Sequence, residues 1–206
     1  MLIKKMEVGN LMSNCYIVGC QDTSEAVVID PGAEPDTILA VLEENNLKVK
    51  YIINTHGHVD HVGANEPVKK ATNADILIHK EDAPLFSNSQ ENLSMYVGGE
   101  LLLSPPERLL EEGDTITFGN ITLKVIHTPG HTRGGISLHG DQVVFTGDTL
   151  FAGSIGRTDL PGGDYQQIIS SIKEKILPLG DDIKVYPGHG PVSTVAREKK
   201  TNPFLQ

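Results

Sequence analysis

The chain has 206 residues, enough for one well-packed domain, and its 38% hydrophobic and 21% charged residues are ordinary for a soluble globular protein. A formal net charge of −10, with basic residues clustered only over residues 197–200, argues against a nucleic-acid-binding surface. No apolar run approaches the roughly 20 residues that cross a bilayer, and the N-terminus does not resemble a signal peptide. We therefore expect a cytoplasmic protein with no membrane and no nucleic-acid partner.

Short β-branched runs recur along the chain, with helical patterns between some of them. The expected strands, in chain order, cover residues 26–29, 51–53, 76–78, 121–126, 142–145 and 183–186. The expected helices begin at Pro35 and then cover residues 62–71, 165–177 and 192–200, the third stopped by Pro178. Strands grouped with helices before and after them predict packed sheets with helices outside.

Residues 87–106 interrupt this alternation. They show no clear period and are polar, with several glycines and prolines. We expect a long surface loop that could cover a site, because long loops without secondary structure are often functional.

Two cysteines, Cys15 and Cys20, lie five positions apart near an apparent strand. They form no C-x-x-C motif, so the sequence gives no sign of a redox or metal pair there. We expect buried thiols in a reducing compartment.

The segment Thr55-His56-Gly57-His58-Val59-Asp60-His61 is the most informative part of the sequence. It places four potential metal ligands within six positions, directly after an expected strand. Imidazoles bind zinc or iron through one ring nitrogen, and a carboxylate adds negative charge to the same cluster. Three histidines this close would repel one another if protonated, so the pattern indicates a cation site.

Three further candidates share one local design. His131, Asp148 and His189 each lie just beyond an expected strand, next to a glycine that lets the chain turn sharply. Binding residues suit such loops because the sheet fixes where each loop begins. Turn chemistry does not call for histidine, so the repeated Pro-Gly-His favours a functional role.

With these residues the chain resembles the metallo-β-lactamase superfamily, from Val28-Ile29-Asp30-Pro31-Gly32 to Gly188-His189-Gly190. The resemblance implies a single α/β domain over residues 1–206, folded as an αββα sandwich. It implies two divalent metal ions per chain, zinc first, with iron or manganese as alternatives. The implied ligands are His56, His58 and His131 for the first ion, Asp60, His61 and His189 for the second, and Asp148 as the bridge.

This ligand set leaves room for solvent on both ions, which is typical of a catalytic rather than a structural site. Two such ions share a bridging hydroxide that attacks a carbonyl or phosphoryl group, with Asp60 and Asp148 as the carboxylates at the reaction centre. Asp30 has two interpretations, a turn residue before Pro31 or an acceptor that orients a ligand histidine. His79, His127 and His139 match no ligand position.

The stretch from Gly147 to Asp159 is similar to the region after the bridging aspartate in glyoxalase II-type hydroxyacylglutathione hydrolases. Arg157 falls where that group has a lysine that contacts glutathione; it could grip a substrate carboxylate or brace the loop by pairing with Asp159. The C-terminal glutathione-binding helical domain of those enzymes is not expected here. The resemblance therefore implies a hydrolase for a small-molecule thioester, hydroxyacylglutathione-like, acting as a monomer or homodimer.

One rival interpretation is an oxidoreductase. Persulfide dioxygenases share this fold and carry a Gly-Arg-Thr-Asp sequence resembling residues 156–159. They use a single iron, for which the corresponding ligands here are His56, His131 and Asp148. The Leu160-Pro161-Gly162-Gly163-Asp164 segment is more similar to short glyoxalase II-like proteins and favours hydrolysis. A metal-binding protein without catalysis is a third possibility, and the complete ligand set argues against it.

Overall fold

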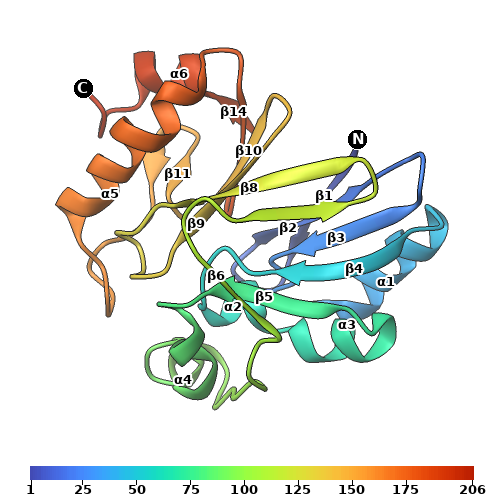
Figure 1. The fold of residues 1–206 in the computed structure, drawn as a ribbon. Helices are drawn as coiled ribbons and strands as arrows, with labels where there is room; N and C mark the ends of the chain where they lie inside the picture. Colours follow the sequence, from blue (N-terminus) through green and yellow to red (C-terminus); the bar gives the residue numbers. More distant parts are fainter.

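Two six-stranded sheets lie face to face in the computed structural model, which describes residues 1–206 (Figure 1). The first has strand order β1-β2-β3-β4-β5-β6 and the second β14-β13-β10-β9-β8-β7, while β11 and β12 pair only with each other. The strands of the first sheet are β1 (Leu2–Val8), β2 (Ser13–Gly19), β3 (Glu25–Ile29), β4 (Lys48–Ile53), β5 (Asp75–His79) and β6 (Arg108–Leu110). The other strands are β7 (Thr115–Phe118), β8 (Ile121–His127), β9 (Ile136–Gly140), β10 (Val143–Gly147), β11 (Leu150–Phe151), β12 (Ser154–Ile155), β13 (Lys184–Pro187) and β14 (Ser193–Thr194).

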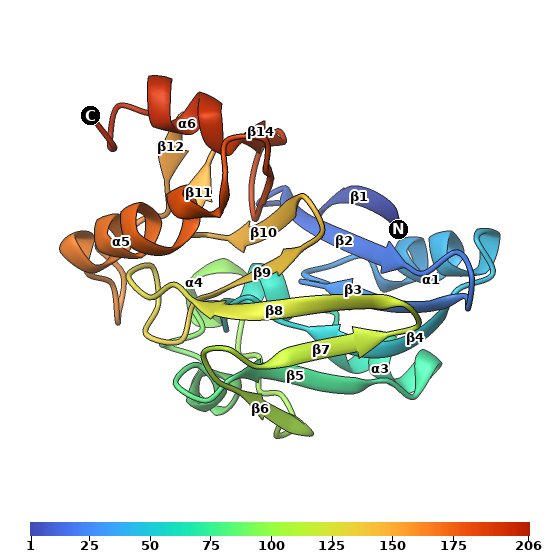
Figure 2. The same ribbon diagram turned by 45° about the horizontal axis from the view of Figure 1, so that its top comes forward.

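Helices cover the outer face of each sheet (Figures 1 and 2). The α-helices are α1 (Pro35–Glu44), α2 (Val59–Val62), α3 (Asn65–Thr72), α4 (Ser94–Val97), α5 (Tyr165–Ser171) and α6 (Val195–Thr201), with shorter helical turns η1 (Ala83–Ser87), η2 (Ile172–Ile176) and η3 (Leu177–Leu179). Helices α1 and α3 pack on the first sheet, and α5 and α6 pack on the second. This order of layers confirms the predicted αββα sandwich.

The alternation of strand side chains explains the layers. On β2, Tyr16 and Val18 point between the sheets, whereas Cys15 and Ile17 point toward α1 and α3. On β10, Phe145 points between the sheets and Val144 toward α5. Both faces of these strands are therefore buried, which is why their sequences are almost continuously apolar.

Strand direction brings the ends of several strands to one edge of the sandwich. Strand β8 is antiparallel to β9, and β9 is antiparallel to β10, so β8 and β10 run the same way. Strand β13 is parallel to β10. The loops that follow β8, β10 and β13 therefore leave from the same edge, and a hydrogen bond from Ile136 N to Thr55 O (2.8 Å) joins them to the loop after β4.

The expected strands are all present, each shifted or extended by one to three residues. Strand β2 is the apparent strand near Cys15, whereas the expected runs do not include β1, β6, β7, β9, β11, β12 or β14. In β1 and β7, polar residues interrupt the apolar pattern. The helix expected over residues 165–177 begins as α5 but continues as the π-helical turn η2 and the 3₁₀ turn η3. Pro178 lies inside η3, so the helical path ends two residues later than expected, at Leu179.

Two further expectations concern the segment 87–106 and the two cysteines. The segment 87–106 is a surface stretch, as expected, but it contains the single turn α4. Cys15 and Cys20 are free thiols, and their burial is confirmed. No helix in the structure combines the length and the apolar character that a membrane span needs.

Candidate metal centre

The seven predicted ligand residues come together at this edge, in the loops after β4, β8, β10 and β13 and at the start of α2. They are His56, His58, Asp60, His61, His131, Asp148 and His189. Most are buried, and none belongs to the interior of a strand. Residues separated by more than a hundred positions in sequence thus form one cluster of nitrogen and carboxylate donors.

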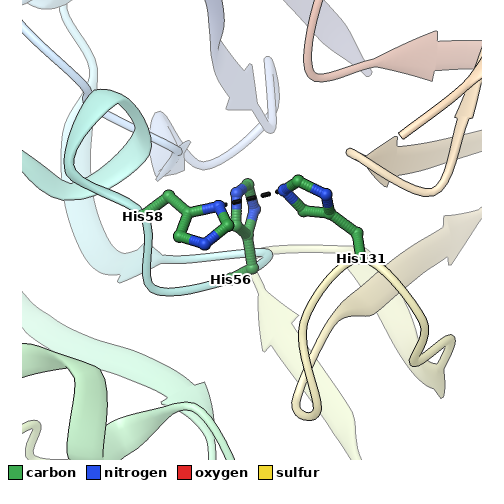
Figure 3. A group of neighbouring side chains, drawn as sticks. All are labelled: His56, His58 and His131. Carbon is green, nitrogen blue, oxygen red and sulfur yellow. Dashed lines mark hydrogen bonds between the residues drawn. The ribbon is translucent and has the colours of Figure 1, made fainter. Parts of the chain in front are cut away.

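His56, His58 and His131 form the first group of three. One nitrogen from each ring lies within 4.8 Å of the others, and the three rings point toward one another (Figure 3). Nδ1 of His58 is 2.9 Å from Nε2 of His131. Nε2 of His56 is buried with no hydrogen-bond partner, although buried polar atoms are normally satisfied. A cation bound between the rings would satisfy it.

Asp60, His61 and His189 form the second group. Nε2 of His61 is 3.3 Å from Nε2 of His189 and 3.4 Å from Oδ2 of Asp60. Nε2 of His189 is 3.2 Å from Oδ2 of Asp60. A tetrahedral ion with metal–nitrogen bonds of about 2.0–2.1 Å holds its ligand atoms about 3.4 Å apart. The donor atoms therefore already have the spacing that a small divalent ion requires.

Asp148 lies between the two groups. Its Oδ1 is 3.4 Å from Nε2 of His61, while its Oδ2 is 3.5 Å from Nε2 of His131 and 3.6 Å from Nε2 of His189. Oδ1 is buried and accepts no hydrogen bond. One carboxylate thus faces both groups, which is the position that a bridging ligand needs.

Asp30 fixes two of the histidines through their second ring nitrogens. Its Oδ2 accepts hydrogen bonds from Nδ1 of His61 (3.0 Å) and from Oγ1 of Thr55 (2.6 Å). Because the Thr55 hydroxyl proton is used in this way, its oxygen accepts from Nδ1 of His56 at 3.2 Å. In the neutral rings this arrangement leaves the lone pair on Nε2, which faces the cluster. Asp30 also has a positive φ of 52°, so the turn role and the orienting role are both present.

His131 is oriented by backbone rather than by a carboxylate. Its Nδ1 donates to the carbonyl oxygen of Arg157 at 2.7 Å, which leaves Nε2 free to face His58 and Asp148. The Arg157 backbone thus contributes to the centre independently of its side chain.

Asp82 is a part of the site that the sequence did not reveal. Its Oδ1 accepts from the N–H of Gly134 (2.6 Å), and its Oδ2 accepts from the N–H of Gly57 (3.0 Å) and from Oγ1 of Thr132 (2.7 Å). Burial raises the pKa of Asp82, and these three hydrogen bonds oppose that rise. This carboxylate joins the loop of His56 and His58 to the loop of His131. In the sequence it looks like an ordinary polar residue before a turn.

The electrostatics differ between the two groups. Burial, with the neighbouring His131, lowers the pKa of His58 to about 3, so this ring is neutral at pH 7. Burial would also lower the pKa of His61, but the carboxylates of Asp60 and Asp148 outweigh it and raise the pKa to about 10. Burial opposes ionisation of Asp60 as well, yet His61 and His189 hold its pKa below the ordinary value. The second group therefore strongly favours a positive charge among its carboxylates.

The cluster opens into a pocket of about 640 Å³, lined by His58, Asp60, His131, Asp148 and His189 among others. Arg157 lies at the rim, with its side chain 68% exposed and both Nε and a terminal nitrogen bonded to Asp159 at 2.9 Å. An open centre of this kind admits substrate, as catalytic metal sites do.

The remaining histidines are not part of the cluster. His79 and His127 stack on each other, with ring centroids 4.1 Å apart, and their nitrogens bond to backbone groups. His139 lies within β9.

Comparison with known sequences agrees with this picture. The family model described as metallo-beta-lactamase superfamily matches residues 8–189. Among curated relatives, the hydroxyacylglutathione hydrolase GloC of Haemophilus influenzae is 39% identical over 100% of this chain and 98% of its own length.

Solved structures give the same result. The BLEG-1 B3 metallo-beta-lactamase superposes with a TM-score of 0.94 at 36% identity, covering 99% of both chains. TTHA1623, solved in a di-iron-bound form, superposes with a TM-score of 0.88 at 37% identity, covering 98% of this chain and 100% of its own. ETHE1 from Myxococcus xanthus gives 0.83 at 29% identity over 98% of this chain and 84% of its own.

Proposed function

This chain belongs to the metallo-β-lactamase superfamily, and from that premise we propose that it is a dinuclear metallohydrolase that cleaves a thioester of the hydroxyacylglutathione type. We propose His56, His58 and His131 as ligands of one ion, Asp60, His61 and His189 as ligands of the other, and Asp148 as their bridge. The observation that carries the proposal is the position of Asp148, whose carboxylate lies within 3.4–3.6 Å of His131 in the first group and of His61 and His189 in the second.

When bound, two divalent ions supply a hydroxide at neutral pH and a Lewis acid for the carbonyl oxygen. The protein's part is to hold the donors and to handle the proton. Asp30 and the Arg157 carbonyl fix His61 and His131 through their Nδ1 protons. The carboxylate of Asp60, with 18% of its side chain exposed toward the pocket, is placed to accept the proton released during attack.

The metal identity is also a proposal. Imidazole and carboxylate donors suit zinc, iron and manganese. We propose zinc, with iron as the alternative that the di-iron form of TTHA1623 supports. One apolar layer fills the space between the two sheets, which supports treating residues 1–206 as one domain. We propose that this domain acts on a small molecule in the cytoplasm, as a monomer or homodimer.

A second candidate, a mononuclear-iron persulfide dioxygenase, is favoured by the likeness to ETHE1. It would use His56, His131 and Asp148 for a single iron. Under this alternative the donors Asp60, His61 and His189 have no metal to hold.

The test is elemental analysis of the purified protein, with S-D-lactoylglutathione hydrolysis and oxygen uptake with glutathione persulfide assayed on the same sample. We expect about two metals per chain and thioester cleavage. The His189→Gln variant separates the candidates, because it removes a donor of the second group only. We expect it to lose one metal and its hydrolysis. One iron per chain, with oxygen uptake that survives this substitution, would establish the dioxygenase instead.

A further inference from the structure

The walls of the pocket are apolar right up to the metal centre. Apart from the five predicted ligands and Arg157, every lining side chain is aliphatic, aromatic or proline. The first wall consists of Leu11, from the turn between β1 and β2, together with Leu93, Tyr96 and Val97 at α4. Val59 N, next to the ligand His58, donates to the Asn92 carbonyl at 2.8 Å and so ties this segment to the centre.

The side chains of this wall are more exposed to solvent than those of a protein core. Tyr96 is 74% exposed, and Leu11 and Val97 are about half exposed. Single exposed apolar residues are common, but here several from separate segments gather at one opening. Covering them with an apolar ligand would remove this surface from water.

The second wall belongs to the β11–β12 hairpin and the loop after it. It contains Phe151, Ile155, Leu160 and Pro161. The Phe151 ring meets the ring of His189 edge-on, with centroids 6.0 Å apart, so apolar surface reaches the predicted metal ligands directly. Helix α4 lies toward the bottom of Figure 1 and β11 toward the top, so the two walls come from opposite sides of the centre.

Positive charge is scarce in this pocket. Arg157 is its only basic lining residue apart from the histidines, and its guanidinium already makes two hydrogen bonds to Asp159. Glutathione has two carboxylates and one ammonium group, and binding it would call for several charged partners. For an anionic group, the lining therefore has a single cation, Arg157, which is already paired with Asp159. For a hydrocarbon chain, it has two apolar walls.

We propose that this pocket selects uncharged thioesters with an apolar acyl chain of medium length, in preference to glutathione thioesters. The proposal rests on the thioester hydrolysis proposed above and changes only the substrate, from a glutathione thioester to an uncharged one with an apolar acyl chain. In the reaction, water oxygen bonds to the carbonyl carbon and the carbon–sulfur bond breaks. The sulfur leaves with the electron pair and takes up a proton, giving a carboxylic acid and a thiol. The pocket volume of about 640 Å³ is ample for such a chain.

The experiment compares three substrates on the metal-loaded protein: S-hexanoyl-N-acetylcysteamine, S-acetyl-N-acetylcysteamine and S-D-lactoylglutathione. Burial of one methylene is worth about a fourfold gain, so the four extra methylenes of the hexanoyl chain should raise kcat/KM about 10- to 100-fold over acetyl if partly buried. We expect the hexanoyl thioester to exceed lactoylglutathione as well.

Two tyrosine variants provide a matched pair. Tyr96→Ser removes an aromatic ring from the first wall, and we expect it to reduce the hexanoyl-to-acetyl ratio several-fold. Tyr165→Ser removes another exposed ring, 52% exposed, from α5, outside the pocket, and should leave the ratio unchanged. An equal effect of both substitutions would count against the pocket.

The outcomes separate the two proposals. Equal rates for hexanoyl and acetyl, or a preference for lactoylglutathione, would overturn the apolar selectivity and leave the hydrolase standing. Cleavage of no thioester by the metal-loaded protein would overturn the hydrolase. Calorimetric titration with the uncleavable thioether S-hexyl-N-acetylcysteamine then still tests the pocket: binding that Tyr96→Ser weakens supports it, and absence of binding overturns it.

Discussion

The metal centre and the rim of the pocket differ in how firmly the fold holds them. At the centre, His61 and His131 each have their second nitrogen bonded to a partner, and the groups behind them, such as Asp30 and Asp82, are buried. At the rim, Tyr96 is 74% exposed and the Arg157 side chain 68%. The centre is therefore held by buried hydrogen bonds, whereas the rim is exposed, and exposed segments of this kind tolerate change.

The largest effect is expected from a substitution of Asp148, the proposed bridging ligand. Asp148→Asn replaces one carboxylate oxygen with an amide that cannot bridge two cations. We expect a loss of activity of roughly 10²–10³-fold or more, as for removal of a principal transition-state stabiliser, together with a loss of bound metal. Elemental analysis and steady-state kinetics check both. Asp141→Asn, the same change at an exposed turn, is the control, and full metal content in Asp148→Asn would refute the bridging assignment.

Substitution of Asp82 tests whether the buried groups that hold the ligand loops in place affect metal affinity and activity. In Asp82→Asn, an amide NH₂ must face at least one of the donors that now bond to the carboxylate, Gly57 N, Gly134 N or Thr132 Oγ1. We expect metal affinity or activity to fall about 10- to 100-fold, the usual cost of removing a group that orients a ligand. Metal titration measures it, with the exposed Asp75→Asn as control. Unfolding without change in metal affinity would make Asp82 purely structural.

His79 should make the stability of the folded protein depend on pH. Burial, with the nearby His127, lowers its pKa to about 4, against 6.5 in an exposed histidine. Between these values the unfolded chain binds a proton that the folded chain does not, so stability falls as pH drops from about 6.5 toward 4. The loss between pH 7 and pH 4.5 amounts to about 2 kcal/mol. His79→Phe keeps the stacked ring and removes the titration, so denaturation at the two pH values should show a correspondingly smaller difference.

Arg157 gives the smallest expected effect, because its side chain is exposed and ion pairs at the surface are weak. If it binds a substrate carboxylate, Arg157→Ala should raise KM for S-D-lactoylglutathione up to about fivefold and leave metal content unchanged. Arg197→Ala, an exposed arginine of α6, is the control. An unchanged KM would assign Arg157 to bracing the loop with Asp159.

Much of the site was predictable because its donors are few, chemically distinctive and close to strand ends. His56, His58, Asp60 and His61 lie within six positions, and His131, Asp148 and His189 each lie beside a glycine at a strand end. The layers of the fold followed from β-branched runs and helical spacing. The strand β1 is not among the expected runs, because polar residues break up its apolar pattern.

The sequence by itself identified the candidate donor residues of the centre and the order in which they appear along the chain. Only the tertiary structure showed that Asp82 links two ligand loops, and that Leu11, Tyr96 and Phe151 meet around one opening. The physical reason is that a metal donor is recognisable from its own chemistry, whereas a buried carboxylate or an apolar wall acquires its role from partners that lie far away in sequence.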